Sequence, residues 1–338
     1  MDRRDTLRAA LAVGAVCTLS GGRAQTPKQH SLPVLGILSG LPIASPEHWA
    51  SSPFWEPLRE LGWIEGRNFS VVRASSYPDD DRLPSMAEEL VRKRVDVIFA
   101  ASNEAAIAAA RATKSIPIVF WGVNYPVELG LVDSLAHPGG NVTGVALYVG
   151  PAEFTKTLDF LKELAPQAKR LSYLYEAAHM RRVDGTRWEF ADDYIETAAR
   201  RVGFESHQYA LSPERGLGIA FEDMLAAKTQ AVYVSFSKFT IEARQRIIDF
   251  ANTNRLPSAF NSFDDVFFGG LLCYGPDMRD LFRRAADSVD KVLRGAHTKD
   301  LPVELPTRFR LGINRGTAKR LGLAIPTSLE ARAERFVD

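Results

Sequence analysis

The sequence predicts an α/β fold in which two similar lobes each contain a parallel β-sheet. Short apolar segments alternate with amphipathic segments along the chain, and the same order of segments occurs in both halves. The 338 residues are 46% hydrophobic and 25% charged, which is enough apolar material for two cores. Strands separated by helices of this length form βαβ units, whose right-handed crossovers place helices on both faces of a sheet.

The first half begins with the apolar run Val34–Leu38, which is typical of a buried strand. Phe54, Leu58 and Leu61 follow at helical spacing within residues 52–61. The same reasoning predicts the remaining elements of this half. Strands are expected at 68–74, 95–100, 116–120 and 141–145, and helices at 81–93, 103–113 and 127–136.

The second half repeats this order, down to a proline at the second position of the last strand of each set, Ile116–Phe120 and Leu256–Phe260. Such a repeat predicts two lobes of similar topology. Beyond it, the sequence predicts a strand and turn at Gly269–Pro276 and a long helix that starts at Asp277 and ends at Gly295. The last expected elements are a strand at Leu301–Pro306, a strand at Phe309–Asn314 and a short helix at Thr317–Leu321.

The first residues have the pattern of a secretory signal peptide. Three arginines lie within the first eight residues, Ala9–Leu19 is apolar, and Gly22–Ala24 has the small-x-small pattern of a cleavage site. The apolar run is shorter than the roughly 20 residues that a membrane-spanning helix needs. We therefore expect residues 1–24 to be a leader that is removed during export to the periplasm, by the general or the twin-arginine route.

The balance of charges argues against nucleic acid as a partner. The full chain has a formal net charge of +1, and the expected leader contains four Arg and two Asp. The processed chain would carry 38 basic and 39 acidic residues, so no basic face is implied. Because Cys17 lies in the leader, Cys273 is left alone in an apolar run, where a packed thiol is expected.

No catalytic or metal-binding pattern occurs in the sequence. The six histidines are scattered, HExxH, GxSxG and P-loop patterns are absent, and no GxGxxG follows the first strand. Asp79–Asp81 lies where a helix is expected to begin, so an interaction with the helix dipole is favoured over a metal site. We therefore expect no enzyme activity, no cofactor and no bound metal.

Candidate ligand-binding residues follow the predicted strands of both lobes. In a parallel sheet each strand leads to a helix N-terminus, where free N–H groups and the helix dipole favour an anion. Aromatic residues at these strand ends offer an apolar surface to a ring, and for each Ser or Asn helix capping alone remains the alternative. The candidates are Ser39, Gly40, Ser102, Asn103, Trp121, Asn124 and Tyr125 in the first lobe, and Tyr175, Glu176, Ser235, Phe236, Asn261, Phe263 and Asp264 in the second.

Six stretches spread over most of the processed chain resemble the substrate-binding proteins of ABC transporters that have the type I periplasmic-binding fold. They are LRELGWIEGRNFSV (58–71), RLPSMAEELVRKRVDVIFA (82–100), SIPIVF (115–120), LVDSLAHPGGNVTGV (131–145), YGPDMRDLFRRAADSVDKVLRG (274–295) and LPVELPTRFRLGINRGTAKRLGLAIP (301–326). The resemblance implies two Rossmann-like lobes joined by three hinge strands and a solute bound in the cleft between them. It also implies an ABC permease in the inner membrane as the partner.

We expect the first lobe to hold residues 30–146 and 274–302, the second to hold 147–273 and 303–338, and the protein to be a monomer. A ligand sensor that docks on a membrane receptor and a two-lobed periplasmic enzyme are the alternatives.

One departure from the family concerns the solute. Where many members have Asp-Pro after the strand that matches Ile116–Phe120, this chain has Tyr125-Pro126. An acidic residue at this place can contact the ammonium group of an amino acid, and Tyr125 cannot. We therefore expect an aromatic or apolar solute with a carboxylate and no amino group, unless Glu176 or Asp264 points into the cleft.

Overall fold

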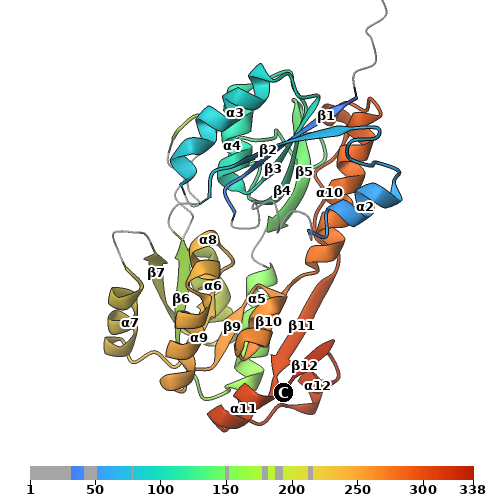
Figure 1. The fold of residues 1–338 in the computed structure, drawn as a ribbon. Coiled ribbons are helices and arrows are strands. Elements are labelled where there is room, and N and C mark those ends of the chain that lie inside the picture. Colours follow the sequence, from blue (N-terminus) through green and yellow to red (C-terminus); the bar gives the residue numbers. More distant parts are fainter. Residues whose placement is uncertain are drawn as a thin grey trace, which may run out of the picture. The chain divides into compact units, whose positions relative to one another are not determined.

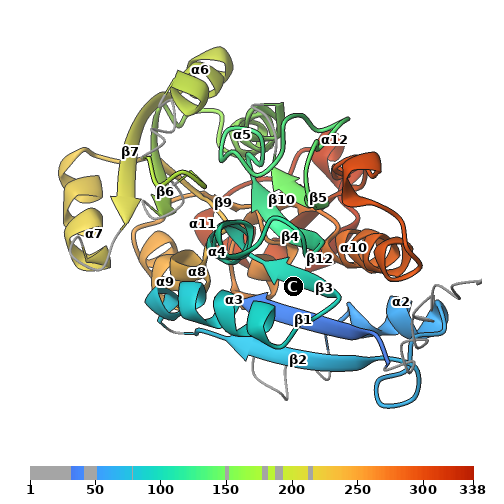
Figure 2. The ribbon, with the colours of Figure 1, turned by 90° about the horizontal axis from the view of Figure 1, so that it is seen from above.

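The computed structural model describes residues 32–41, 52–77, 79–148, 152–176, 182–186, 193–211 and 216–338. The expected leader, with Cys17 and the cleavage site, lies outside these residues. Within the unit Leu32–Asp338 there are two β-sheets, each covered by helices on both faces (Figures 1 and 2). None of the helices in the described part of the chain has the length and apolar character that crossing a membrane requires.

The first sheet consists of five parallel strands in the order β2-β1-β3-β4-β5. They are β1 (Val34–Ser39), β2 (Ser70–Ser75), β3 (Val97–Ala101), β4 (Ile118–Asn124) and β5 (Val142–Tyr148). The strand order reverses between β1 and β3, because β2 lies on one side of β1 and all later strands lie on the other. Open α/β sheets bind ligands at such a reversal, beyond the carboxyl ends of the strands.

Helices bury both faces of this sheet because its side chains alternate. Leu35 and Ile37 of β1 face one core cluster and Leu38 faces the other, and all three are fully buried. Helices α3 and α4 cover one face, and α2 and α10 cover the other (Figure 2). Their bounds are α2 (Trp55–Glu60), α3 (Leu83–Arg92), α4 (Asn103–Ala112) and α10 (Met278–Leu293), and the 3-10 turn η2 (Asp80–Arg82) precedes α3.

The second sheet repeats the first and extends it. Its parallel strands β7-β6-β8-β9-β10 match the order of the first sheet strand for strand. Beyond them, β11 pairs antiparallel with β10, and β12 pairs parallel with β11. The strands are β6 (Arg170–Glu176), β7 (Glu205–Leu211), β8 (Ala231–Val234), β9 (Ser258–Phe260), β10 (Leu272–Pro276), β11 (Phe309–Asn314) and β12 (Arg335–Val337). The expected α/β fold with parallel sheets in two lobes is thus confirmed.

Helices α5 and α6 pack on one face of the second sheet, and α7 and α9 pack on the other. The lone thiol, Cys273 of β10, is buried in the second of these cores, as expected. The helical elements of this lobe are α5 (Ala152–Leu164), α6 (Asp193–Val202), α7 (Leu217–Ala226), α8 (Lys238–Glu242), α9 (Arg244–Thr253), η4 (Phe263–Phe268), α11 (Arg315–Leu321) and α12 (Thr327–Glu330).

The chain passes between the two sheets three times. It does so between β5 and α5, between β10 and α10, and between the 3-10 turn η5 (Thr298–Asp300) and β11. The third passage was expected to contain a strand at Leu301–Pro306, and this was wrong. Only Glu304 pairs there, with Val145 of β5, since Pro302 and Pro306 have no N–H to donate to a ladder.

Two further expectations in the first lobe were wrong. The segment 127–136 forms turns instead of a helix, because Gly130 adopts a φ of +72° that a right-handed helix does not allow. Its apolar pattern had a different cause, since Leu129 and Leu131 are buried in the core without helical backbone. Strand β4 continues to Asn124, four residues beyond the expected end, so Trp121 lies inside the strand and not in the loop after it.

Candidate functional site

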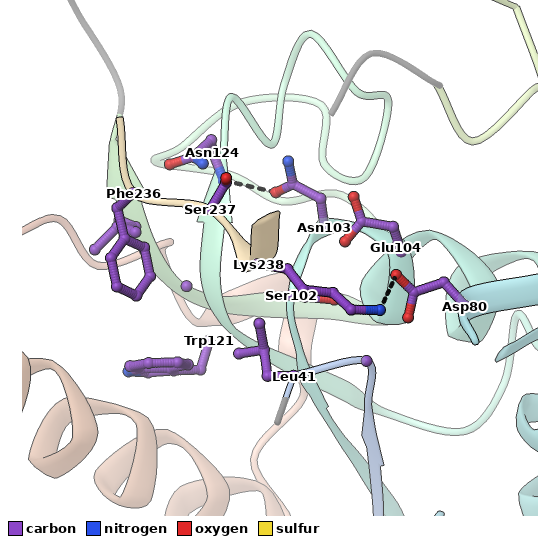
Figure 3. Close-up of a pocket in the computed structure, with 13 residues that line it drawn as sticks. Leu41, Asp80, Ser102, Asn103, Glu104, Trp121, Asn124, Phe236, Ser237 and Lys238 are labelled. Carbon is purple, nitrogen blue, oxygen red and sulfur yellow. Dashed lines mark hydrogen bonds and ion pairs between the residues drawn. The ribbon is translucent and has the colours of Figure 1, made fainter. Parts of the chain in front are cut away.

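A small cavity lies at the carboxyl edge of the first sheet, where the strand order reverses (Figure 3). Its volume is about 30 Å³, which is room for one or two water molecules. Residues of both lobes line it. They are Gly40, Leu41, Asp80, Ser102, Asn103, Glu104, Trp121, Gly122, Asn124 and Leu147 from the first lobe, and Phe236, Ser237 and Lys238 from the second.

Two polar side chains from the start of α4 hold this edge of the first sheet together. Ser102 is the N-cap of α4, and its Oγ accepts a hydrogen bond of 3.2 Å from the N–H of Ala105. Asn103 Oδ1 accepts a hydrogen bond of 2.8 Å from the N–H of Asn124, which fixes the end of β4 (Figure 3). Ser102 adopts a φ of +129°, a strained backbone of the kind often found at ligand sites.

An ion pair spans the cavity from one lobe to the other. Lys238 Nζ, at the start of α8, lies 3.1 Å from Asp80 Oδ2 (Figure 3). Ser76 donates a hydrogen bond of 3.0 Å to the other carboxylate oxygen of Asp80. The carboxylate lies so close to Gly40 that a Cβ there would come within 2.4 Å of Asp80 Oδ1. The ion pair therefore depends on the absence of a side chain at residue 40.

Aromatic residues also make contact across the two lobes. Trp121 of β4 stacks on Phe282 of α10, with ring centroids 4.0 Å apart, and Phe236 of the second lobe packs against the same core. Trp121 Nε1 is buried and has no hydrogen-bond partner among the described residues. Conversely, Tyr125 of the first lobe, with a φ of +54°, packs against the core of the second lobe.

A second polar cluster lies at the carboxyl edge of the second sheet. Asn261, directly after β9, donates a hydrogen bond of 3.0 Å from Nδ2 to Glu153 Oε1 in the first turn of α5. Burial raises the pKa of Glu153 to about 7, and the hydrogen bond from Asn261 offsets only part of this effect. Burial also raises the pKa of Tyr173 and Tyr274, and the charge of Glu153 adds to both shifts, so these rings lie near the carboxylate.

Of the candidate residues, six line the cavity between the lobes: Gly40, Ser102, Asn103, Trp121, Asn124 and Phe236. Ser39 lies beneath it, fully buried, where its Oγ accepts a hydrogen bond from the N–H of Leu41. Tyr175 and Ser235 contact the second cluster, since Tyr175 stacks on Tyr173 and Ser235 hydrogen-bonds to it.

Neither acidic candidate offers a free carboxylate beside these groups. Glu176 Oε2 accepts a hydrogen bond of 3.1 Å from the N–H of Phe239 in α8. Asp264 is exposed in η4. Its neighbour Phe263 is buried under the guanidinium of Arg310, 3.8 Å from the ring centroid. In the described part of the chain no three His, Cys, Asp or Glu side chains come together as a metal site would require.

Several residues of the two clusters were not among the candidates, and three of them carry charge and form contacts described above: Asp80, Lys238 and Glu153. Each lies in the first turn of a helix, where a charged residue is ordinary in sequence. The signal for Lys238 was its place directly after the capping residue Ser237, at the end of a strand loop. For Glu153 the sequence carries no signal, because its partner Asn261 lies 108 residues away.

Comparison with known proteins identifies the family. Residues 48–337 match the family model described as ABC transporter substrate binding protein. The tyrosine-binding protein of Clostridioides difficile (strain R20291) is 29% identical over 274 residues, which are 81% of this chain and 76% of that protein.

Solved structures agree on the fold, which is that of type I periplasmic binding proteins. The crystal structure of an ABC domain in complex with L-Trp from Streptococcus pneumonia has a TM-score of 0.80 at 23% identity, and the match covers 91% of this chain and 100% of that one. A conserved domain protein from Vibrio cholerae has the same TM-score and identity, with coverages of 90% and 100%. This chain therefore belongs to the ABC transporter substrate binding protein family.

Proposed function

We propose that this chain is the exported solute receptor of an ABC importer. It binds a small organic solute between its lobes and presents the closed, loaded form to a permease in the inner membrane. The observation that carries this proposal is the cavity at the strand-order reversal, which both lobes line and the Asp80–Lys238 ion pair spans. A site divided in this way takes its ligand by hinge closure. The protein acts as a monomer, without a cofactor and without a catalytic step.

The solute combines an aromatic or apolar group with a carboxylate. The N-terminus of α4 points at the cavity and favours an anion there. The rings of Trp121, Phe236, Tyr125 and Tyr175 supply aromatic contacts at the facing strand ends. Two relatives support this class of solute, since one is a tyrosine-binding protein and another was solved in complex with L-Trp.

The cavity of about 30 Å³ is far smaller than the several hundred Å³ that a ligand of this kind needs. The lobes must therefore separate before the solute enters. The three passages between the sheets act as the hinge, with residues 30–146 and α10 moving as one lobe. Because β10 extends to Pro276 within the second sheet, we place the second lobe boundary at Asp277. Residues 1–24 direct export and are removed.

A thermal-shift screen tests this proposal. The processed protein is heated with L-tyrosine, L-tryptophan, benzoate, 3-phenylpropionate and, as controls, sugars of similar size. A solute at 100 times its Kd adds about 2.7 kcal/mol to the free energy of unfolding, which is a clear rise in melting temperature. Small-angle scattering should then show compaction with each hit. Stabilisation by the sugars alone would contradict the proposed solute class, and a hit without compaction would contradict hinge closure.

A further inference from the structure

The Glu153 carboxylate, at the carboxyl edge of the second sheet, is only partly satisfied by the described residues. An ionised carboxylate has about four acceptor positions, and among the described residues only Asn261 donates to it, with no Lys or Arg forming an ion pair. The amide oxygen of the same Asn261 is buried and has no hydrogen-bond partner there either. Glu153 Oε2 and Asn261 Oδ1 thus have no hydrogen-bond donor among the described residues.

Leaving a buried carboxylate without a cation is costly, because the protein interior does not replace the lost water. The raised pKa of Glu153 is one sign of that cost. The backbone of Asn261 is nevertheless held in place by a close approach to β10. A Cβ at Gly275 would come within 1.9 Å of the Asn261 carbonyl oxygen, so glycine at this position allows the two backbones to lie this close. Such an arrangement is complete only when a cationic donor is added.

The aromatic surroundings of this pair match a nitrogen cation. Tyr125 of the first lobe packs against the same core as Tyr175 and Tyr274 of the second, and the charge of Glu153 raises the pKa of Tyr274. Aromatic rings favour a cation at their faces. An ammonium group has three N–H donors and no acceptor, which complements two unpaired oxygens.

We propose that Glu153 and Asn261 form a subsite for a protonated amino group of the solute. This deepens the proposed function and rests on it, because it narrows the solute from aromatic acids to aromatic compounds that also carry an amine. It also replaces the expectation of a solute without an amino group, which was drawn from Tyr125 alone. The acidic partner comes from the first turn of α5 instead of from the loop after β4.

Calorimetry with four probes tests the subsite: L-tyrosine, the same molecule without its amino group (3-(4-hydroxyphenyl)propionate), the same molecule without its carboxylate (tyramine), and benzoate. In the wild type, L-tyrosine should bind at least about tenfold tighter than its deamino analogue, a difference of about 1.4 kcal/mol. Glu153→Gln keeps the size of the side chain and removes its charge. It should weaken the binding of L-tyrosine by about tenfold or more. The affinity for the deamino analogue should change by less than about threefold.

Two variants complete the design. Glu153→Asp keeps the charge and should restore part of the preference for the amine. Glu163→Gln is the matched control, since Glu163 lies on the same helix but is already paired with Arg332, and it should leave the affinities of all four probes within about twofold. If Glu153→Gln does not fold, the ratio of the affinities of L-tyrosine and its deamino analogue in the wild type still tests whether the site prefers an amino group.

The outcomes separate this inference from the proposed function. Tight binding of the deamino analogue and benzoate, with no gain from the amino group, would overturn the subsite and leave the aromatic-acid receptor standing. Tyramine binding that depends on Glu153, with no binding of either acid, would support the subsite and contradict the carboxylate part of the proposed function. Equal loss of all probes in Glu153→Gln would also overturn the subsite, and no binding of any probe would refute both.

Discussion

Glu153 and Lys238 show how differently two partly buried charges can be treated in one molecule. Lys238 is paired with Asp80 at 3.1 Å, whereas the described partner of the Glu153 carboxylate is a neutral amide. Proteins tend to keep such destabilising groups where function requires them. Replacing such a residue of the binding site should therefore make the unliganded protein more stable.

We expect Glu153→Gln to stabilise the unliganded protein, and more so at high pH. The pKa of Glu153 is raised from 4.5 to about 7 in the folded state, so the folded protein holds a proton that the unfolded chain has lost between these values. Stability is therefore lost as the pH rises from about 4.5 to 7, and Gln abolishes this loss. The gain from the substitution should grow by about 1–3 kcal/mol between pH 5 and pH 8.

Urea unfolding of both proteins at pH 5, 6, 7 and 8 measures this gain. Glu163→Gln serves again as the control. Burial raises the pKa of Glu163, but the hydrogen bonds from Arg332 and Ser328 outweigh it and lower the pKa overall. Its substitution should therefore be neutral or destabilising at pH 8. A gain for Glu153→Gln that is the same at every pH would show that its carboxyl is not desolvated.

At the scale of helices and strands, elements whose apolar residues recur at a regular spacing could be predicted from the sequence, whereas turns could not. Helix α3 was expected at 81–93 and is found at Leu83–Arg92, because its apolar residues recur at helical spacing. The segment 127–136 carries a similar pattern, but the φ of Gly130 is set by packing that no local pattern records.

The same distinction between predictable and unpredictable residues holds for the two binding clusters. Gly40, Ser102 and Asn103 were predictable because strand ends of a parallel sheet meet at one edge. Asp80 and Lys238 were not, since the pair joins residues 158 positions apart and exists only when the two lobes meet.

The pairing of β4 and β5 leads to a prediction at this scale. Gly144 of β5 has a φ of +152°, and a Cβ there would lie 2.2 Å from the carbonyl oxygen of Phe120. Its own carbonyl accepts the N–H of Glu304 from the third passage between the sheets. Gly144→Ala should therefore lower the free energy of unfolding by about 2–4 kcal/mol.

Urea denaturation compares this variant with Gly140→Ala, in the loop before β5. A Cβ at Gly140 would have no neighbour within 4 Å, so this substitution should be neutral or stabilise by up to about 1 kcal/mol. Equal stability of the two variants would mean that β5 shifts away from β4 at little cost.

At the scale of the whole unit, the described residues join the two lobes by contacts of different chemical kinds. Phe236 packs on the first core and Tyr125 packs on the second. Arg111 of α4 donates hydrogen bonds to the carbonyl oxygens of Arg182 and Val183, and the Asp80–Lys238 ion pair joins the edges of the lobes. Apolar contacts of this kind are insensitive to salt, whereas a partly exposed ion pair is screened by it. The equilibrium between open and closed forms should accordingly depend on ionic strength through the Asp80–Lys238 pair.

Lys238→Met tests that dependence, because methionine keeps much of the apolar stem and removes the charge. A partly buried ion pair of this kind contributes about 1 kcal/mol. Its loss should therefore shift the unliganded protein toward the open form and weaken the binding of a solute that binds only the closed form by about fivefold. Scattering of the unliganded protein should show a larger radius of gyration, and the salt dependence of the affinity should decrease.

Arg283→Met, which breaks the exposed pair with Glu60 inside the first lobe, should change neither the radius of gyration nor the salt dependence. Because Lys238 also lines the cavity, the unliganded measurement decides the matter: if Lys238 merely contacts the solute, Lys238→Met will weaken binding while the unliganded protein remains as compact as the wild type.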